Sequence, residues 1–489
     1  MSKRTAVVIL YAALLVASIL QVFQSIVVAH FFEPEELAPY RYGILTGGFA
    51  YLFATGFVDS VFYFISGKYA PNARKYVGNT LVNCSLIFLS ILFFFHVLLK
   101  PYVLVHTELA PYLSEIGAYL VIILFLCINL TAHNVLVGTD QSAAASGLRL
   151  FQYLLRALAI AATLFYGLIT SIYQLILLMI FLEAFQTLLY GLALLNRKLL
   201  SFQIRGIEAK LQYKYVLSLG IAGLIPFINA SLDKIMISAF LGPSSFAIYS
   251  ISAIELPIAG IIIAVFGSVF FASYVKYAES NDYRSMAQLW HKCSLHGAIV
   301  NIPLGISVFL FSDILYQLIL PDAYFEGHRV LGIYALLLLL RFNSPDVLAK
   351  ALDRNTIIVE AAVVSLIVNI IGNLIFIKTL GLWGAALATF LGIATGWIYY
   401  LVRYARLLKI TVGQLFPWKP YVRLITISVF FFGSARWTFE NIGISVTLIF
   451  LSLVVYLYYA YFLLERSEKD YIMGWLRTIR FRPRSIRNE

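Results

Sequence analysis

Apolar stretches of about 20 residues follow one another along most of this chain, with few charged residues between them. A helix of that length crosses the roughly 30 Å hydrocarbon core of a bilayer. Charged residues make up only 12% of the 489 residues, against about 25% in a typical soluble domain. The sequence therefore predicts an all-α polytopic membrane protein.

The lengths of the apolar windows and the charges that separate them place about 14 transmembrane helices. The first is too long for the apolar core of a signal peptide and is expected to stay in the protein. Short connections near Thr170 and at 242–245 leave 12 helices as the alternative. The predicted helices span 5–32, 42–66, 79–99, 113–137, 148–169, 172–195, 214–241, 246–274, 291–316, 328–349, 356–378, 381–404, 420–436 and 441–464.

Basic residues gather at one set of helix ends, and cytoplasmic loops are enriched in Lys and Arg. Both termini are therefore expected in the cytoplasm, and the chain in a cytoplasmic (inner) membrane. The orientation of the chain and contact of its basic residues with anionic lipid headgroups account for the net charge of +12. No nucleic-acid partner is therefore predicted. The basic groups lie at 3–4, 68–75, 197–214, 276–292, 350–354, 403–423 and 466–487.

A pattern at 31–40 recurs at 240–249, with Phe, Pro, Ala and Tyr at the same spacing. Lys-Tyr-Ala at 68–70 recurs at 276–278, and a weaker echo links 135–141 with 347–354. A chance match in a chain with 32 Tyr and 38 Phe is the alternative. Duplication predicts two six-helix lobes related by a pseudo-two-fold axis along the membrane normal, with the function between them.

The predicted division of the chain follows from these repeats and from the longest charged connection. We expect an N-terminal lobe at 1–200, a cytoplasmic loop at 201–214 and a C-terminal lobe at 215–410. Two additional helices at 411–465 and a basic tail at 466–489 fall outside the duplication.

Ionisable groups inside a span cost a few kcal/mol, so they are expected to face a protein interior or a wet cavity. Arg156 and Arg341 are predicted near the centres of helices in different lobes, where their paired donors suit a diphosphate. The alternative is a salt bridge between helices, for example with Glu183 or Glu255. We treat both arginines as candidate substrate-binding residues.

Asp233 follows Asn229 by one helical turn and corresponds through the repeat to Gln24. We therefore expect Gln24 and Asp233 to face each other across the lobes, with Gln24 and Asn229 near the substrate. No Walker-type phosphate loop is present, so an ion gradient is the expected driver. Asp233 is the first candidate for the coupling site, followed by Glu255 and Glu183.

Catalytic chemistry finds little support in the sequence. The seven histidines and three cysteines are scattered without the spacing of metal ligands. We predict no catalytic residues, no metal and no cofactor, and we do not expect an enzyme.

Two segments carry a resemblance to a known family. They are 233–249, with Asp233 followed by a small turn and Tyr249, and 369–389, with Asn369, Asn373 and the run Gly-Ala-Ala-Leu-Ala-Thr ending at Thr389. Together they resemble the polysaccharide transporter family of the multidrug/oligosaccharidyl-lipid/polysaccharide (MOP) exporter superfamily. The first span departs from the superfamily's drug exporters, because it carries no carboxylate.

The resemblance implies a flippase that moves an undecaprenyl-diphosphate-linked oligosaccharide across the membrane by alternating access, for surface polysaccharide synthesis. Its implied partners are the lipid-linked substrate, membrane lipids and a polysaccharide polymerase or glycosyltransferases. One alternative function is a proton- or sodium-coupled exporter of small molecules. A second is a polytopic glycan polymerase or glycosyltransferase, which needs an acidic pair that the sequence does not display.

Overall fold

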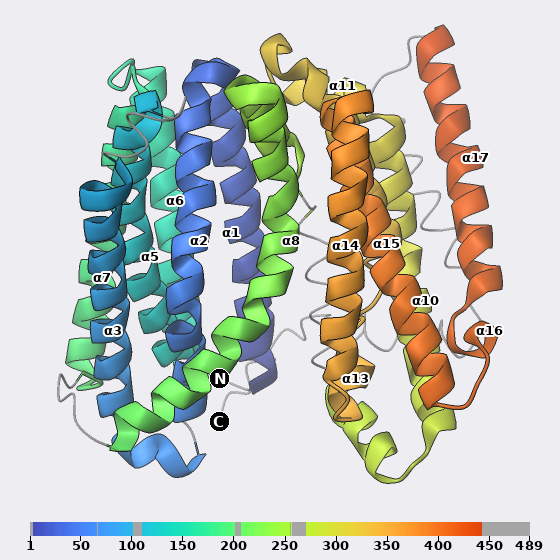
Figure 1. Cartoon of the computed structure of the whole chain (residues 1–489), viewed down its shortest axis with the longest axis horizontal. Helices are drawn as coiled ribbons and strands as arrows, with labels where there is room; N and C mark the ends of the chain where they lie inside the picture. Colours follow the sequence, from blue (N-terminus) through green and yellow to red (C-terminus); the bar gives the residue numbers. More distant parts are fainter. Residues whose placement is uncertain are drawn as a thin grey trace, which may run out of the picture.

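The structure, a computed structural model, describes residues 3–65, 67–100, 110–200, 207–254, 256 and 270–442. These ranges are almost wholly helical and contain no strand. The helices form two lobes side by side, with the N-terminal lobe in blue to teal and the C-terminal lobe in yellow to orange (Figure 1). Glu255, most of the predicted helix 441–464 and the basic tail lie outside the described residues.

The N-terminal lobe contains six long helices that match the first six predicted spans. In it α1 packs against α6, α2 against α5, and α5 against α7. The short turns η1 (Gly67–Asn72) and η3 (Ala110–Tyr112) precede two of the helices, and the π-helical turn η2 (Phe95–Leu99) extends α3. The helices are α1 (Lys3–Phe31), α2 (Pro34–Phe64), α3 (Ala73–Phe94), α5 (Leu113–Gly138), α6 (Ser142–Phe165) and α7 (Ile172–Asn196).

Helix α2 begins two turns earlier than the predicted residue 42. Pro34 occupies its first turn, where a missing N–H costs nothing. The side chains of Glu33 and Glu36 form a capping box with the free backbone N–H groups of that turn. As a result Arg41, expected in a loop, lies inside the helix and is 7% exposed.

The C-terminal lobe is less regular than the N-terminal lobe. Residues 270–279 are also helical, and η4 (Asp322–Gly327) and η5 (Leu337–Leu339) are short 3₁₀ turns. Helix α14 packs against α15 and against α8, and α17 packs against α10. The helices are α8 (Ile207–Ser252), α10 (Tyr283–Leu310), α11 (Ser312–Ile319), α12 (His328–Leu336), α13 (Val347–Ala351), α14 (Thr356–Leu380), α15 (Leu382–Leu407), α16 (Val412–Leu415) and α17 (Trp418–Ile442).

The prediction of one continuous helix at 328–349 is wrong. Helix α12 ends at Leu336, and non-helical residues separate η5 from α13. Pro345 lies in this break; it has no N–H to donate and disfavours a helical conformation at the residue before it. Arg341, expected at the middle of a helix, lies in the break instead.

Helix α8 consists of two helices that meet at Gly242, whose φ of 85° and ψ of −179° are not helical. The Tyr249 hydroxyl donates a hydrogen bond to Asp233 Oδ2 over 2.5 Å. In a straight helix, 16 residues would separate these two positions by roughly 24 Å. The chain therefore reverses at Gly242, as the predicted turn requires.

The two lobes repeat each other in their contacts as well as in sequence. Gln24 Nε2 donates to the hydroxyl of Tyr40 over 3.5 Å, at the same 16-residue separation as Asp233 and Tyr249. Tyr40 packs edge-on against Tyr119, with ring centroids 5.7 Å apart. Tyr249 packs in the same way against Tyr334, at 6.1 Å.

Helix ends repeat too. Three pairs of residues with positive φ end corresponding helices in the two lobes, at separations of 213, 214 and 211 positions. After the first pair, the amides of Gln141 and Arg354 donate to the carbonyls of Leu136 and Ala349 over 2.9 and 2.8 Å, as in a Schellman cap. These pairs extend the evidence for duplication to the later helices of each lobe. They are Asp140 and Asp353, Gly167 and Gly381, and Lys198 and Lys409.

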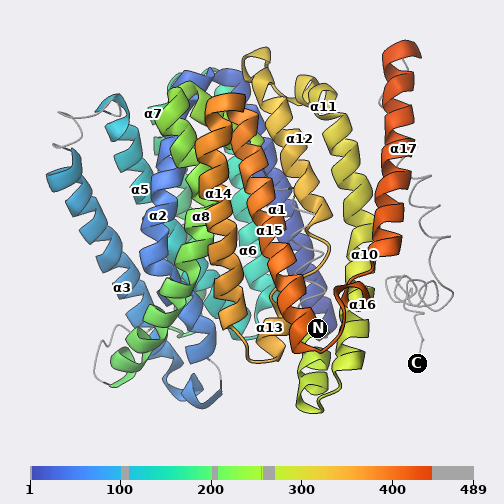
Figure 2. The same cartoon turned by 45° about the vertical axis from the view of Figure 1, so that its right-hand side comes forward.

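The lobes touch along α2 and α8, including the end of the bundle that carries the α1–α2 turn. The hydroxyls of Tyr42 and Ser238 are hydrogen-bonded at 2.6 Å, and the ring of Tyr42 stacks on Phe246. The Tyr324 hydroxyl donates to the Phe32 carbonyl over 2.6 Å. Figure 2 shows this end of the bundle at the top, with α2 and α8 side by side.

Near the opposite end, the start of α8 packs on the N-terminal lobe. Residues 207–214, expected in a loop, are helical, and Gln212 is fully buried. Its amide donates to Ser60 and Thr80 over 3.0 and 2.7 Å and accepts from Asn79 over 2.6 Å. The connection between the lobes is thus held by polar contacts inside the protein.

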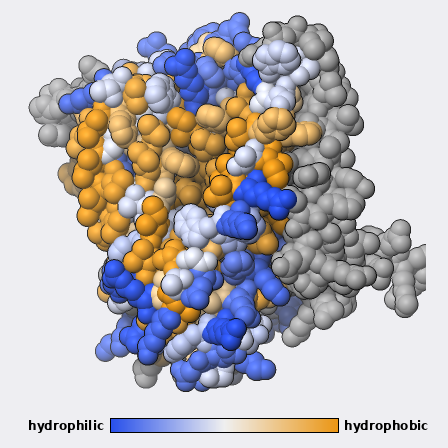
Figure 3. Space-filling view, turned by 90° about the vertical axis from the view of Figure 1, so that its right-hand side faces the viewer, coloured by the Kyte–Doolittle hydropathy of each residue, from blue (hydrophilic) through white to orange (hydrophobic). Residues whose placement is uncertain are grey.

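The outer surface suits a bilayer. Ten described helices are long and apolar enough to cross a membrane. On the face shown in Figure 3, hydrophobic residues gather in a broad zone, with hydrophilic residues at the lower end and along the top. The described part of the chain is therefore a multi-pass membrane protein.

Candidate functional site

A buried polar cluster lies inside the N-terminal lobe, where α1, α5, α6 and α7 meet. Arg156 Nη1 and Glu183 Oε1 form a salt bridge at 3.0 Å. Arg156 Nε also donates to Gln24 Oε1 over 2.9 Å. The other carboxylate oxygen of Glu183 accepts from Asn129 and Gln152 over 2.9 and 2.8 Å. Every charge in this cluster has a partner.

This geometry matches the salt-bridge alternative for Arg156. Glu183 is 0% exposed and Arg156 is 8% exposed, so the pair is withdrawn from water and from the space between the lobes. A buried pair is tolerated where further hydrogen bonds satisfy both ions, as Gln24, Asn129 and Gln152 do here. An anion that approached Arg156 would have to compete with Glu183.

The C-terminal lobe contains a second buried cluster, centred on Asp233 at 1% exposure. Its Oδ2 accepts hydrogen bonds from the hydroxyls of Tyr249 at 2.5 Å and Tyr334 at 2.7 Å. Thr389 donates to the same oxygen over 3.3 Å. Oδ1 accepts the backbone N–H of Lys234 over 2.8 Å. Asp233 forms no ion pair with any described residue, so this carboxylate is held by neutral donors alone.

A row of amides continues from Asp233. The Asn369 side chain donates to Asn229 Oδ1 over 3.0 Å, and its Oδ1 accepts from Asn373 over 2.7 Å. Asn369 and Asn373 are fully buried, one turn apart on α14. Asn373 Oδ1 is buried and accepts no hydrogen bond from the described residues. This orphaned oxygen lies in the same network as the lone carboxylate.

The expectation that Gln24 and Asp233 face each other across the lobes is wrong. The hydrogen-bond partners of Gln24, Tyr40 and Arg156, belong to the N-terminal lobe. Asp233 has its side-chain partners in the C-terminal lobe. The repeat places the two residues at equivalent positions, but each side chain points into its own lobe.

Arg341 lies in the break just after η5, a short distance along the chain from Tyr334. Its carbonyl accepts a hydrogen bond from Asn301 over 2.5 Å, which satisfies a backbone group that the broken helix leaves open. The residue is half-buried. Non-helical backbone at membrane depth is tolerated where it is buried in protein or lines a cavity. The structure therefore joins Asn229 to Asp233 through Asn369 and Thr389, and Gln24 and Glu183 to Arg156.

The oxygens around Asp233 have the chemistry of a cation site. Carboxylate, amide and hydroxyl oxygens are ligands for hard cations, and the network offers Asp233, Asn369, Asn373 and Thr389. A single carboxylate balances one positive charge, which fits a proton or a monovalent cation. No group of three or more His, Cys, Asp or Glu that would hold a metal ion occurs among the described residues.

Sequence reasoning assigned no role to Tyr249, Tyr334 or Thr389. The repeat offered a signal for Tyr249, because Gln24 with Tyr40 and Asp233 with Tyr249 have the same spacing. Thr389 appears in the sequence only as part of the family resemblance. Tyr334 comes from a broken helix, and no spacing in the sequence indicates that it reaches Asp233.

These features define a two-lobed bundle of membrane helices with a buried polar cluster in each lobe. A lipid II flippase MurJ in an inward closed conformation matches this fold with a TM-score of 0.68, covering 93% of this chain and 97% of that one at 15% identity. An inward-facing MATE multidrug transporter of the MOP superfamily matches with a TM-score of 0.64, 80% and 96% coverage and 13% identity. A mutant of the Vibrio cholerae MATE transporter VcmN matches with a TM-score of 0.58, covering 82% of this chain and 94% of that one at 13% identity.

The chain matches no protein-family model and no curated protein sequence. At these identities the solved structures establish the fold, which is that of MOP-superfamily transporters. The resemblance drawn from 233–249 and 369–389 is therefore confirmed for the fold. The matched proteins named above are a flippase and transporters rather than enzymes.

Proposed function

We propose that this chain is a flippase that moves an undecaprenyl-diphosphate-linked oligosaccharide across the cytoplasmic membrane by alternating access of its two lobes. The observation that carries the proposal is the nearly end-to-end match with a lipid II flippase, which covers 93% of this chain and 97% of that one. Both termini would lie in the cytoplasm. A polymerase or glycosyltransferases of surface polysaccharide synthesis would act beside it.

Arg341 is the stronger of the two proposed arginine ligands for the anionic headgroup. It is half-buried and lies in a break of the helix, where backbone and side chains line binding sites in many transporters. Arg156 is engaged in the salt bridge with Glu183, and Gln24 accepts a hydrogen bond from the same guanidinium, so Arg156 is less available to a ligand. Asn229 reaches the network of Asp233 through Asn369.

Ion coupling is assigned to Asp233. A cation bound there would draw on the carboxylate and on the amide oxygens of α14, and so would tie α8 to α14 and α15. Binding that favours one arrangement of the lobes shifts the population toward it. Glu183 is engaged by Arg156, which makes it a weaker coupling candidate. Glu255 lies outside the described residues.

The test is flipping of a lipid-linked oligosaccharide in proteoliposomes, with and without a sodium or proton gradient. Asp233→Asn keeps the size of the side chain and removes its charge. We expect the stimulation by the gradient to fall about 5- to 150-fold, the usual range of coupling between sites. Asp59→Asn, at an exposed carboxylate on α2, is the control and should retain coupling. Unchanged stimulation in Asp233→Asn would remove this residue from coupling.

An ion-coupled exporter of small molecules is the second candidate. The observation that favours it is the match with MATE multidrug transporters in both inward- and outward-facing conformations. The same proteoliposomes can be loaded with a fluorescent organic cation such as ethidium. Gradient-driven ethidium movement without flipping of the lipid-linked oligosaccharide would replace the flippase by the exporter.

A further inference from the structure

Arg41 is a buried cation with no charged partner among the described residues. It lies on α2 and is 7% exposed, and its Nε and Nη2 atoms are buried without a hydrogen-bond acceptor. Its guanidinium lies 5.6 Å from the centre of the Tyr40 ring. Burying an unpaired charge is costly, so a sequence that retains one needs a reason.

Tyrosines from both lobes surround Arg41. Four tyrosines lie close enough to interact with its guanidinium: Tyr40 and Tyr119 in the N-terminal lobe, and Tyr324 and Tyr316 in the C-terminal lobe. A carboxylate is not among them. Arg41 is therefore placed where the lobes meet, and an anion that reached it would find a guanidinium with free donors and several hydroxyl groups.

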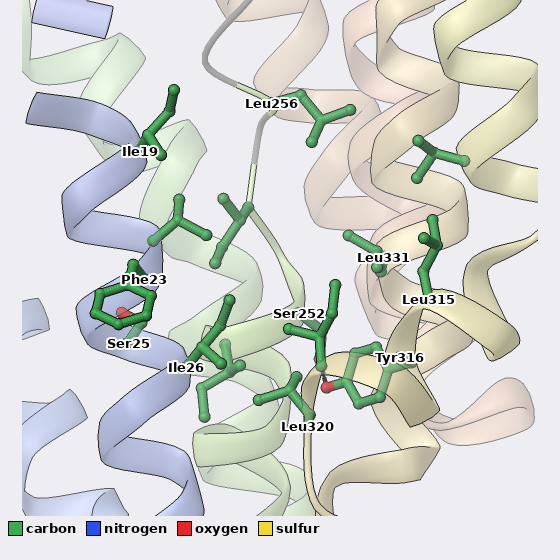
Figure 4. A pocket seen from close by; sticks show the side chains of 15 residues that line it. Ile19, Phe23, Ser25, Ile26, Ser252, Leu256, Leu315, Tyr316, Leu320 and Leu331 are labelled. Carbon is green, nitrogen blue, oxygen red and sulfur yellow. Dashed lines mark hydrogen bonds between the residues drawn. The ribbon is translucent and has the colours of Figure 1, made fainter. Parts of the chain in front are cut away.

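An apolar pocket of about 350 Å³ shares one of these tyrosines. Side chains of α1, of residues 251, 252, 254 and 256, and of α10 to α12 line it (Figure 4). The hydroxyls of Tyr316 and Ser252 are hydrogen-bonded at 2.7 Å and form its polar corner. Ile19 and Phe23 in the α1 wall are 54% and 48% exposed, so the pocket is open along this wall. An apolar chain can therefore reach it from outside the protein.

We propose that Arg41 and this pocket together form a second station for the lipid-linked substrate, the Arg41 station, with the diphosphate at Arg41 and the first isoprenoid units in the pocket. The inference rests on the proposed flippase function. It places an anion site at the end of the bundle that carries the α1–α2 turn, in addition to the one proposed at Arg341. A volume of 350 Å³ is at the small end of ligand sites and admits part of one chain.

A diphosphate is favoured over an ordinary phospholipid because of charge. A diphosphate ester offers several oxygens that can accept the paired donors of one guanidinium, whereas a phosphodiester carries a single charge. Parting of the lobes would separate Tyr316 and Tyr324 from Arg41 and open its donors. The station would then hold the substrate at one stage of alternating access.

The experiment measures binding of radiolabelled geranylgeranyl diphosphate to the full chain in lipid nanodiscs. Arg41→Gln should weaken binding about ten- to a hundredfold, the loss of one charged hydrogen-bonding partner, and Arg41→Lys should weaken it less. Leu315→Trp fills the pocket and should weaken binding of the isoprenoid diphosphate. Because Leu315→Trp leaves Arg41 in place, the affinity for inorganic pyrophosphate, measured by competition, should stay at the wild-type level.

Leu318→Trp is the matched control on the same helix, because Leu318 is 63% exposed and does not line the pocket. It should bind like the wild type. Unchanged affinity in Arg41→Gln would overturn the proposal. Equal competition by dioleoyl phosphatidylglycerol would also overturn it, since the site would then hold an ordinary phospholipid.

Thermal stability separates a ligand role from a structural one. Removing an unpaired buried charge should leave the melting temperature of Arg41→Gln unchanged or higher, and a clear fall would assign Arg41 to the fold instead. Flipping by the wild type is measured in parallel. If the wild type flips the substrate but binding is the same with and without Arg41, only this inference is wrong. If the wild type binds the diphosphate through Arg41 but does not flip the substrate, only the proposed function is wrong.

Discussion

Arg156 and Glu183 show how a buried charge in a membrane bundle is kept by its neighbours. Besides their 3.0 Å salt bridge, Arg156 donates a hydrogen bond to Gln24, and the second carboxylate oxygen of Glu183 accepts hydrogen bonds from Asn129 and Gln152. Asp233 contrasts with this pair, because hydroxyl and backbone amide donors hold it and it forms no ion pair with a described residue.

We expect Arg156→Met to lower the free energy of unfolding by about 3–5 kcal/mol, because it leaves Glu183 buried and unpaired. Combining it with Glu183→Met should restore most of the loss, since both charges are then gone. Thermal unfolding in detergent measures both variants. Arg403→Met breaks an exposed salt bridge with Glu360 and should cost no more than about 1 kcal/mol. A single variant as stable as the wild type would contradict this account.

At this scale the sequence predicted that charges would be buried but not which side chains would meet. Glu183 was one of two partners proposed for Arg156, and the structure shows that contact. The orientation of Gln24 and the reach of Tyr334 depend on how helices rotate and pack, which local spacing does not determine. Arg41 was missed because the predicted helix began one residue after it.

Helix ends and breaks follow from a few prolines and glycines. Pro34 with the Glu33 and Glu36 capping box explains the early start of α2, and Pro345 explains the break before α13. Both signals were present in the sequence, yet apolar windows and charge breaks alone do not register them. The chain reversal at 242–243 was predicted because two features agreed there, the turn residues and the repeat.

Gly242→Ala tests the reversal within α8. The φ of 85° with ψ of −179° lies in a region that only glycine adopts readily, and a residue held in a sparsely populated conformation costs about 1–3 kcal/mol. A methyl group at Gly242 would meet no atom within 4 Å, so the loss is due to the backbone alone.

Gly191→Ala is the control for that variant. Gly191 also has open space around it, but it lies inside α7, where Ala is favoured over Gly by about 0.5–1 kcal/mol. Gly242→Ala should therefore unfold at a lower temperature than the wild type, and Gly191→Ala at the same or a higher one. Equal behaviour of the two variants would show that the backbone at Gly242 is not strained by a side chain.

The overall architecture was more predictable from the sequence than the individual side-chain contacts were. Apolar windows predicted the helices of the N-terminal lobe one by one, and the short repeats indicated two lobes. The paired left-handed caps at Asp140 and Asp353 extend that evidence across the chain. Contacts between the lobes, such as Tyr42 with Ser238, were not predictable, because they depend on one arrangement of the two lobes.

Charge asymmetry predicts which end of the bundle faces the cytoplasm. Arg197→Cys should react with a membrane-permeant maleimide but not with an impermeant one added to intact cells. Glu326→Cys, at the opposite end, should react with both. The native Cys84, Cys127 and Cys293 are buried, so the background should be low. Labelling of Arg197→Cys by the impermeant reagent would invert the predicted orientation.

The buried Gln212 has a consequence for the covalent connection between the lobes. Its hydrogen bonds to Ser60, Asn79 and Thr80 hold the start of α8 on the N-terminal lobe. We therefore expect that the covalent link between the lobes need not be intact for them to assemble. Two fragments produced from separate genes and divided at 201–206 should assemble into one working transporter, and Gln212→Ala should prevent their assembly.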